Sequence, residues 1–104
     1  TEKGKVGVGK DIRVIGGEVT AWKERKGHAL TPAMITGVYD AGLEVLVIGL
    51  GVQGALACPE DVTRSIRDQG IACVELRRTP EACRLYNTLL RAGKRVALLA
   101  HGTC

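Results

Sequence analysis

Aromatic residues are scarce in this chain of 104 residues, which contains no phenylalanine, one tryptophan and two tyrosines. The core must therefore be aliphatic, built from Val, Leu, Ile and Ala. The scarcity also weakens a nucleic-acid function, because single-strand binding proteins stack bases on aromatic side chains. A net charge of +4 favours such a function, but the basic residues are spread along the chain and most have Asp or Glu nearby. We expect no nucleic-acid partner.

Long hydrophobic runs are also absent. No apolar run approaches the roughly 18 to 20 residues that cross a bilayer, and the start of the chain shows no signal-peptide pattern. Hydrophobic residues make up 45% of the sequence and charged residues 25%, which is ordinary globular usage. We expect a soluble cytoplasmic protein with no membrane partner, formed by one domain over residues 1–104.

Cysteine and histidine are too scattered for a disulfide framework or a metal site. Cys73 lies in an apolar run and Cys83 on the apolar face of a predicted helix, where free cysteine behaves as a small buried hydrophobe. His101 and Cys104 have H-x-x-C spacing, but zinc sites usually show a close ligand pair twice, and no C-x-x-C occurs. A nucleophilic Cys104 lacks an identifiable third orienting group. We expect no metal, no cofactor and no catalytic residue.

Only three prolines occur, and each begins a segment that ends at a glycine: 32–42, 59–70 and 80–93. Proline suits the first turn of a helix, and glycine suits the position just past its end. Thr31 and Thr79 are predicted to cap the first and third of these helices. Apolar runs follow the helices at 43–48, 71–76 and 96–100. The pattern predicts three helix–strand units whose right-handed crossovers place the strands in a parallel sheet.

The first third of the chain has a different pattern. Val6 and Val8, then Ile12 and Val14, alternate with polar residues, and a Gly-Gly pair at 16–17 supplies a tight turn into segment 18–23. We predict an antiparallel hairpin that extends or flanks the parallel sheet. The fold class is therefore α/β.

Gly49, Gly51 and Gly54 form a G-x-G-x-x-G motif directly after a predicted strand, and Glu75 follows near the end of the next strand. Dinucleotide-binding folds use this arrangement to hold a pyrophosphate and a ribose. In those folds the helix starts inside the motif, whereas Pro59 would here fall in its interior, at a cost of about 3 kcal/mol or more. The chain is also too short for a two-halved cofactor domain. We interpret the segment as a loop before a helix that begins near Pro59.

A looser ligand-binding hypothesis concerns the carboxyl ends of the parallel strands, where ligands of open sheets collect. The glycine loop 49–54, the turn at 77–79 and the tail 101–104 are expected to meet there. Backbone N–H groups, helix N-termini and arginines all favour a phosphate or carboxylate. The candidate anion site consists of Gly49, Gly51, Gly54, Arg77, Arg78 and His101. The alternative, which we favour, leaves Arg77 and Arg78 as solvated turn residues.

Several short motifs occur in one order from about Lys10 to the end of the chain. They are the segment 45–51, Gly70-Ile71, Thr79 with Ala82, Tyr86-Asn87 with Leu89, Gly93 with Arg95-Val96, and His101-Gly102-Thr103-Cys104. Together they resemble the adipogenesis-associated Mth-domain family, a domain of unknown function that also includes mitochondrial complex I assembly factors. By its tail, the chain looks closer to the cytoplasmic, adipogenesis-associated branch.

The resemblance implies a three-layer single domain with a mixed, partly parallel sheet. It also implies regulatory or assembly factors that act through other proteins, in a branch linked to fat cell differentiation. No catalytic residues are carried over from the family. We therefore predict a non-enzymatic interaction domain with an unknown protein partner. The alternative is a small-anion binding protein or enzyme using loop 49–54 with Arg77, Arg78 and His101, which predicts a concave pocket with both arginines turned inward.

Overall fold

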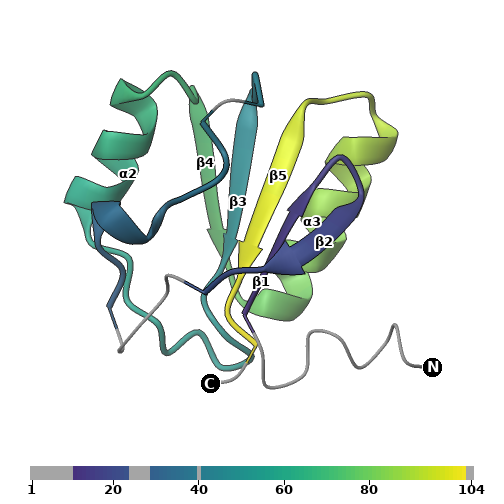
Figure 1. Cartoon of the computed structure of the whole chain (residues 1–104). Helices are drawn as coiled ribbons and strands as arrows, with labels where there is room; N and C mark the ends of the chain where they lie inside the picture. Colours follow the sequence, from purple (N-terminus) through teal and green to yellow (C-terminus); the bar gives the residue numbers. More distant parts are fainter. Residues whose placement is uncertain (1–10, 24–28, 40, 103–104) are drawn as a thin grey trace.

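The computed structural model describes residues 11–23, 29–39 and 41–102, and the statements below concern these residues. They form a three-layer α/β domain, as predicted, with a five-stranded sheet in the middle (Figure 1). Helix α3 (Thr79–Arg91) covers one face of the sheet, and helix α2 (Glu60–Asp68) packs on the other with the short 3-10 turn η1 (Pro32–Met34). No helix in this part of the chain combines the length and the apolarity that a membrane span requires.

The sheet is mixed, with strand order β2-β1-β5-β3-β4. The parallel strands are β3 (Val45–Gly49), β4 (Cys73–Arg77) and β5 (Val96–Ala100). The hairpin strands β1 (Ile12–Ile15) and β2 (Glu18–Ala21) extend the sheet, and β1 pairs antiparallel with β5. The last strand of the chain therefore lies at the centre of the sheet, and β2 and β4 form its two edges.

Alternate residues of β3 and β5 divide the core into two layers. Leu46 and Ile48 face α2 and pack with Val62 and Ile66, while the side chain of Val47 faces α3 with Tyr86. Every residue of β3 and β5 is buried. Their nearly unbroken apolar sequences follow from this burial, because a strand that is covered on both faces has no solvent-facing side chains.

The predicted helix over 32–42 is wrong: only the three-residue turn η1 forms, and the chain continues as an extended loop through Ile35. Two carbonyls that a helix would use are taken by side chains from the hairpin. The Trp22 indole N–H donates to the Met34 carbonyl (2.8 Å), and the Arg13 guanidinium donates to the carbonyl (2.9 Å) and the hydroxyl (2.8 Å) of Thr36. These contacts stabilise the loop instead of the helix.

Most other predicted elements are confirmed with small shifts of their ends. Helix α2 begins one residue after Pro59, β4 begins at Cys73 rather than at residue 71, and β5 has the predicted bounds. Gly16 and Gly17 adopt φ values of 59° and 87°, which suit the two-residue turns that join hairpin strands. Val6 and Val8, which we predicted to belong to the same segment, lie outside the described residues.

Candidate functional site

Thr79 joins the three segments that we predicted to meet at the carboxyl ends of the parallel strands. Its hydroxyl accepts a hydrogen bond from the Gly51 N–H (2.9 Å) and donates one to the His101 carbonyl (2.7 Å). Its own N–H donates to the Gly51 carbonyl (2.9 Å). The prediction that Thr79 caps the helix is therefore wrong, since the cap position is Arg78 and no side-chain cap bond forms there. The side chain of Thr79 instead connects the glycine loop to the tail.

Close packing and backbone conformation explain why positions 49, 51 and 54 of the loop are glycine. A Cβ on Gly49 would lie 2.9 Å from the Thr79 hydroxyl and 3.1 Å from its Cα, so α3 can approach β3 only where a side chain is missing. Gly51 and Gly54 adopt φ values of 97° and 70°, which disfavour other residues. The Gly51 N–H is bound by Thr79, and the Gly54 N–H donates to the Gly51 carbonyl (3.1 Å). These two amides are therefore bonded within the protein.

The two arginines of the predicted anion site differ in their surroundings. The Arg77 guanidinium lies 2.9 Å from a Glu75 carboxylate oxygen and donates to the Leu76 carbonyl (2.9 Å), so it turns back along its own strand. The Arg78 side chain lies against the glycine loop, with its Cγ 3.3 Å from the position of a Cβ on Gly54. Among the described residues, the Arg78 guanidinium has no acidic partner.

His101 is buried, and a carboxylate that the sequence analysis missed binds it. The His101 Nδ1 lies 2.7 Å from an Asp11 oxygen, and the same oxygen accepts a hydrogen bond from the Gly102 N–H (3.1 Å). The His101 N–H donates to the Gly49 carbonyl (2.9 Å). No spacing rule connects two residues that are ninety positions apart, so only the strand pairing of β1 with β5 could reveal this contact. Cys104, at the end of the tail, lies outside the described residues.

The described cysteines are free thiols in environments that suppress their reactivity. Burial raises the pKa of the Cys58 and Cys83 thiols. Burial also raises the pKa of Cys73, as does the hydrogen bond that its thiol donates to Glu75 (3.3 Å). A raised pKa keeps each thiol protonated at neutral pH, and the protonated form is the weak nucleophile. No group of three His, Cys, Asp or Glu side chains within the described ranges could hold a metal ion.

A shallow apolar groove of about 280 Å³ lies between α3 and the β1–β2 hairpin. It is lined by Ile12, Val14, Gly17, Val19, Cys83, Tyr86, Asn87, Leu90 and Leu98. Val19 is 48% exposed and Leu90 is 37% exposed. The buried Tyr86 ring carries a hydroxyl that accepts a hydrogen bond from the Gly17 N–H (2.9 Å), which ties the hairpin turn to α3. This groove was not predicted from the sequence, although Val19, an apolar residue between the polar Glu18 and Thr20 of the predicted hairpin, was a signal for it.

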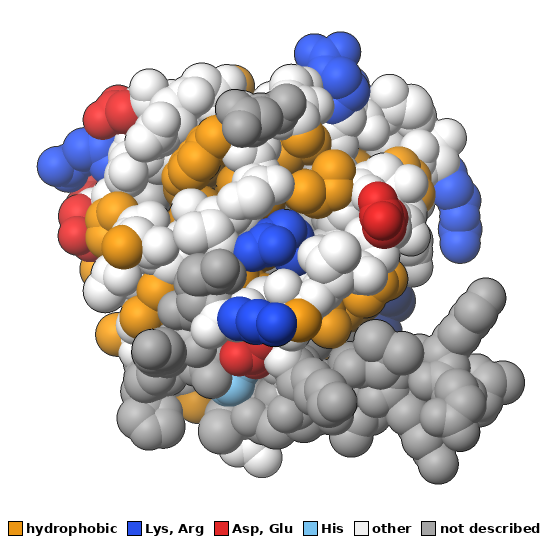
Figure 2. Space-filling view, in the orientation of Figure 1, with side chains coloured by type: hydrophobic (Ala, Val, Ile, Leu, Met, Phe, Trp, Pro, Cys, Tyr) orange, Lys and Arg blue, Asp and Glu red, His pale blue; other side chains and the backbone are white. Residues whose placement is uncertain are grey.

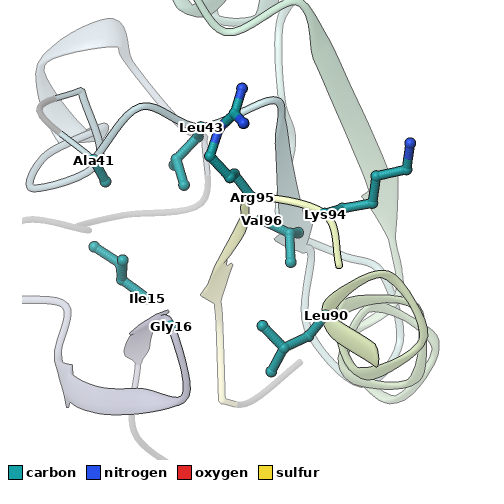
Figure 3. Close-up of a pocket in the computed structure, with 8 residues that line it drawn as sticks. All are labelled: Ile15, Gly16, Ala41, Leu43, Leu90, Lys94, Arg95 and Val96. Atoms are coloured by element: carbon teal, nitrogen blue, oxygen red, sulfur yellow. The ribbon is translucent and has the colours of Figure 1, made fainter. Parts of the chain in front are cut away.

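A second hollow, the amino-end cleft, lies where β5 begins and has a volume of about 250 Å³ (Figure 3). It is lined by Ile15, Gly16, Ala41, Leu43, Leu90, Lys94, Arg95 and Val96. The Arg95 Nε donates to the Gly42 carbonyl (2.6 Å), and its guanidinium lies 3.7 Å from the Glu44 carboxylate. The Arg95 N–H bonded to Glu44 (3.1 Å) lowers the pKa of that carboxyl, and the nearby charges of Arg95 and Lys94 lower it further.

Basic side chains do not form a stripe on the face shown in Figure 2. They lie among apolar, acidic and neutral side chains, and the apolar ones gather between them. This distribution matches the spacing of Lys and Arg along the sequence. It contrasts with the continuous positive surface that tracks a nucleic-acid backbone.

Solved structures with the same fold come from several organisms. A protein described as an outer membrane protein from Bartonella henselae is 27% identical, with a TM-score of 0.75 and coverage of 91% of this chain and 80% of that chain. MT938 is 27% identical, with a TM-score of 0.72 and coverage of 91% and 82%. The conserved hypothetical protein PH1505 from Pyrococcus horikoshii OT3 is 22% identical, with a TM-score of 0.72 and coverage of 91% and 84%. The model of the family described as protein of unknown function (DUF498/DUF598) matches residues 3–101, and the chain belongs to that family.

Proposed function

We propose that the protein is a non-enzymatic interaction domain that binds an extended segment of a partner protein. The segment would add a strand to the edge of β2 and place side chains in the groove between α3 and the hairpin. The observation that carries the proposal is this exposed sheet edge directly beside an apolar groove, with Val19 belonging to both.

The backbone of β2 has hydrogen-bonding groups on its outer side that no other described residue uses. The turn pairs Ile15 with Glu18, and alternate residues of an antiparallel hairpin direct their N–H and C=O groups toward the partner strand. The Trp22 N–H donates to the Asp11 carbonyl (3.0 Å). Trp22 is four positions after Glu18, so both residues direct their backbone groups toward the strand that contains β1. Val19 therefore directs its backbone groups away from β1. All four residues of β2 are exposed, and no described strand pairs on that side. Such an edge is a template for another strand.

The pleat of the sheet predicts the chemistry of the partner segment. Val19 is paired with Val14, and both line the groove on the α3 side, whereas Glu18 and Thr20 belong to the other face of the hairpin. An added strand continues this alternation. We therefore expect a segment of about four or five residues in which apolar side chains alternate with polar ones. Its apolar side chains would enter the groove and its polar side chains would face solvent.

Selection of binders from a random peptide display library, with the purified chain as bait, tests this proposal. We expect the selected peptides to share the apolar–polar alternation and to lose binding to the Val19→Pro variant. The only backbone group that proline removes at this position is an outward-facing N–H, so the β1–β2 hydrogen bonds remain. Val19→Thr, which keeps the N–H and the β-branched shape, is the matched control and should retain binding. Peptides without alternation, or with equal affinity for Val19→Pro, would refute strand addition.

The biological setting of this interaction domain is inferred from the family resemblance. The Tyr86-Asn87 helix motif supports the family resemblance, and the H-G-T-C tail supports membership of the adipogenesis-associated branch, and with it a cytoplasmic regulatory or assembly role. Fractionation of the source cells, followed by detection of the native protein, tests the location. Recovery with an organelle fraction would contradict the cytoplasmic assignment.

A second candidate function is the binding of a small anion at the glycine loop. It is favoured by Arg78, which lies against Gly54 and has no acidic partner among the described residues. The proximity of Asp11 to His101 opposes it, because a carboxylate repels an anion. Thermal-shift measurements with sulfate and phosphate on the native chain and on Arg78→Ala test the site. Stabilisation that depends on Arg78 would support it, and an unchanged melting temperature in both proteins would exclude these anions.

A further inference from the structure

We propose that the partner segment is strand β2 of a second copy of this chain, so that two sheets join edge to edge in a symmetric dimer. This inference rests on the proposed function, because it uses the same edge and the same groove and names what occupies them. Strand β2 lies at an open edge of the sheet (Figure 1), and all four of its residues are exposed. A second copy therefore presents an accessible segment with no described strand on its outer side.

Strand β2 itself has the pattern that we expect of the partner segment. Its residues alternate polar with apolar in the order Glu18, Val19, Thr20 and Ala21. Ala21 pairs with Ile12, which lines the groove, so Ala21 belongs to the same face of the hairpin as Val19. In an antiparallel pair of β2 strands, the exposed Val19 of each copy would lie opposite Ala21 of the other copy. The added strand would therefore cover both apolar side chains beside the groove.

Backbone geometry and charge favour one register for this pair. Val19 and Ala21 direct their backbone groups outward, so each Val19–Ala21 pair can exchange both of its N–H···O=C bonds. This register places the two-fold axis at Thr20, which lies opposite Thr20 of the other copy, and threonine pairs across strands are favourable. The two Glu18 residues lie at opposite ends of the pair, about 13 Å apart along the strands. Like charges therefore do not meet at this interface.

The opposite edge of the sheet, β4, does not offer the same self-pairing. Arg77 faces β3, because its carbonyl accepts the Leu50 N–H (2.8 Å), so the Leu76 backbone faces outward. The Leu76 carbonyl already accepts a hydrogen bond from the Arg77 guanidinium (2.9 Å). Full overlap of two β4 strands would also place Glu75 opposite Glu75 of the other copy, and like charges directly opposite each other are destabilising. Charged side chains of this kind protect a sheet edge, so β2 is the edge that fits a second copy.

Analytical ultracentrifugation of the full chain tests whether the dimer forms. A short edge strand gives a small interface and a weak complex, so the chain should be studied at concentrations up to about 1 mM. We expect the dimer population to rise with concentration, to be lost in Val19→Pro and to persist in Val19→Thr. A chain that stays monomeric throughout would overturn the inference, as would a dimer that Val19→Pro leaves unchanged. If selected peptides still bind in a Val19-dependent way, the proposed function stands and only the identity of the partner is refuted.

Cysteine cross-linking identifies the register of the interface and leaves the backbone of the edge intact. Directly opposite residues that exchange no hydrogen bonds have Cα atoms about 4.5 Å apart, which lies within the range of about 4.4–6.8 Å that a disulfide spans. Mild oxidation should therefore convert Thr20→Cys into a covalent dimer. Glu18→Cys, which is also exposed and lies on the same face of β2, is the matched control and should cross-link no more than the native chain. Cross-linking of Thr20→Cys that does not exceed that of Glu18→Cys would overturn the inference.

Discussion

Thr79 makes the two side-chain hydrogen bonds that join the glycine loop to the tail, and replacing it with valine removes both of them. The substitution keeps the shape of the side chain, but it leaves the Gly51 N–H without its acceptor and the His101 carbonyl without its donor. Leaving a buried polar group without its partner costs about 1–3 kcal/mol. Both groups are partly buried, so we expect Thr79→Val to lower the free energy of unfolding by about 2–4 kcal/mol.

Urea denaturation followed by circular dichroism measures this loss as a fall in the midpoint at constant slope. Thr88→Val is the matched control, because Thr88 lies on the same helix with an exposed side chain. It should change stability by less than about 0.5 kcal/mol. Thr79→Ser keeps the hydroxyl and should retain most of the stability. If Thr79→Val and Thr88→Val have equal effects, the hydroxyl of Thr79 does not hold the three segments together, and the reasoning is refuted.

Three other outcomes follow from single contacts. Gly49→Ala places a methyl group 2.9 Å from the Thr79 hydroxyl and should lower the free energy of unfolding, measured by urea denaturation, by about 1–3 kcal/mol. An unchanged midpoint would show that α3 can move away freely. Tyr86→Phe removes the acceptor of the Gly17 N–H and should lower the free energy of unfolding by about 1 kcal/mol. Hydrogen exchange at the Gly17 amide should become faster, and unchanged exchange there would contradict the contact. Glu44 has a lowered pKa because it accepts a backbone N–H bond, so its contribution to stability is present above its unfolded pKa and is lost as the pH falls through the folded pKa. The difference in midpoint between the native chain and Glu44→Gln should therefore disappear in acid, and a difference that persists at low pH would argue against an ionic origin.

Local sequence signals predicted the elements whose stability is mostly local. Helices α2 and α3 begin beside Pro59 and Pro80 and end before Gly70 and Gly93, because capping and apolar spacing act within a few residues. The same signals failed for 32–42. There the competing partners, Trp22 and Arg13, come from the hairpin, and no pattern within the segment reveals contacts with another part of the chain.

The chain by itself determined the α/β architecture and the meeting of the glycine loop, the turn at 77–79 and the tail, because parallel strands bring their carboxyl ends to one edge of the sheet. Only the tertiary structure decided what those residues contact. It turns Arg77 toward Glu75 and brings Asp11 to His101. It also placed α3 beside the hairpin so that an apolar groove remains open next to Val19. Side-chain partners of this kind depend on the packing of distant segments, which is a property of the whole fold and not of local sequence.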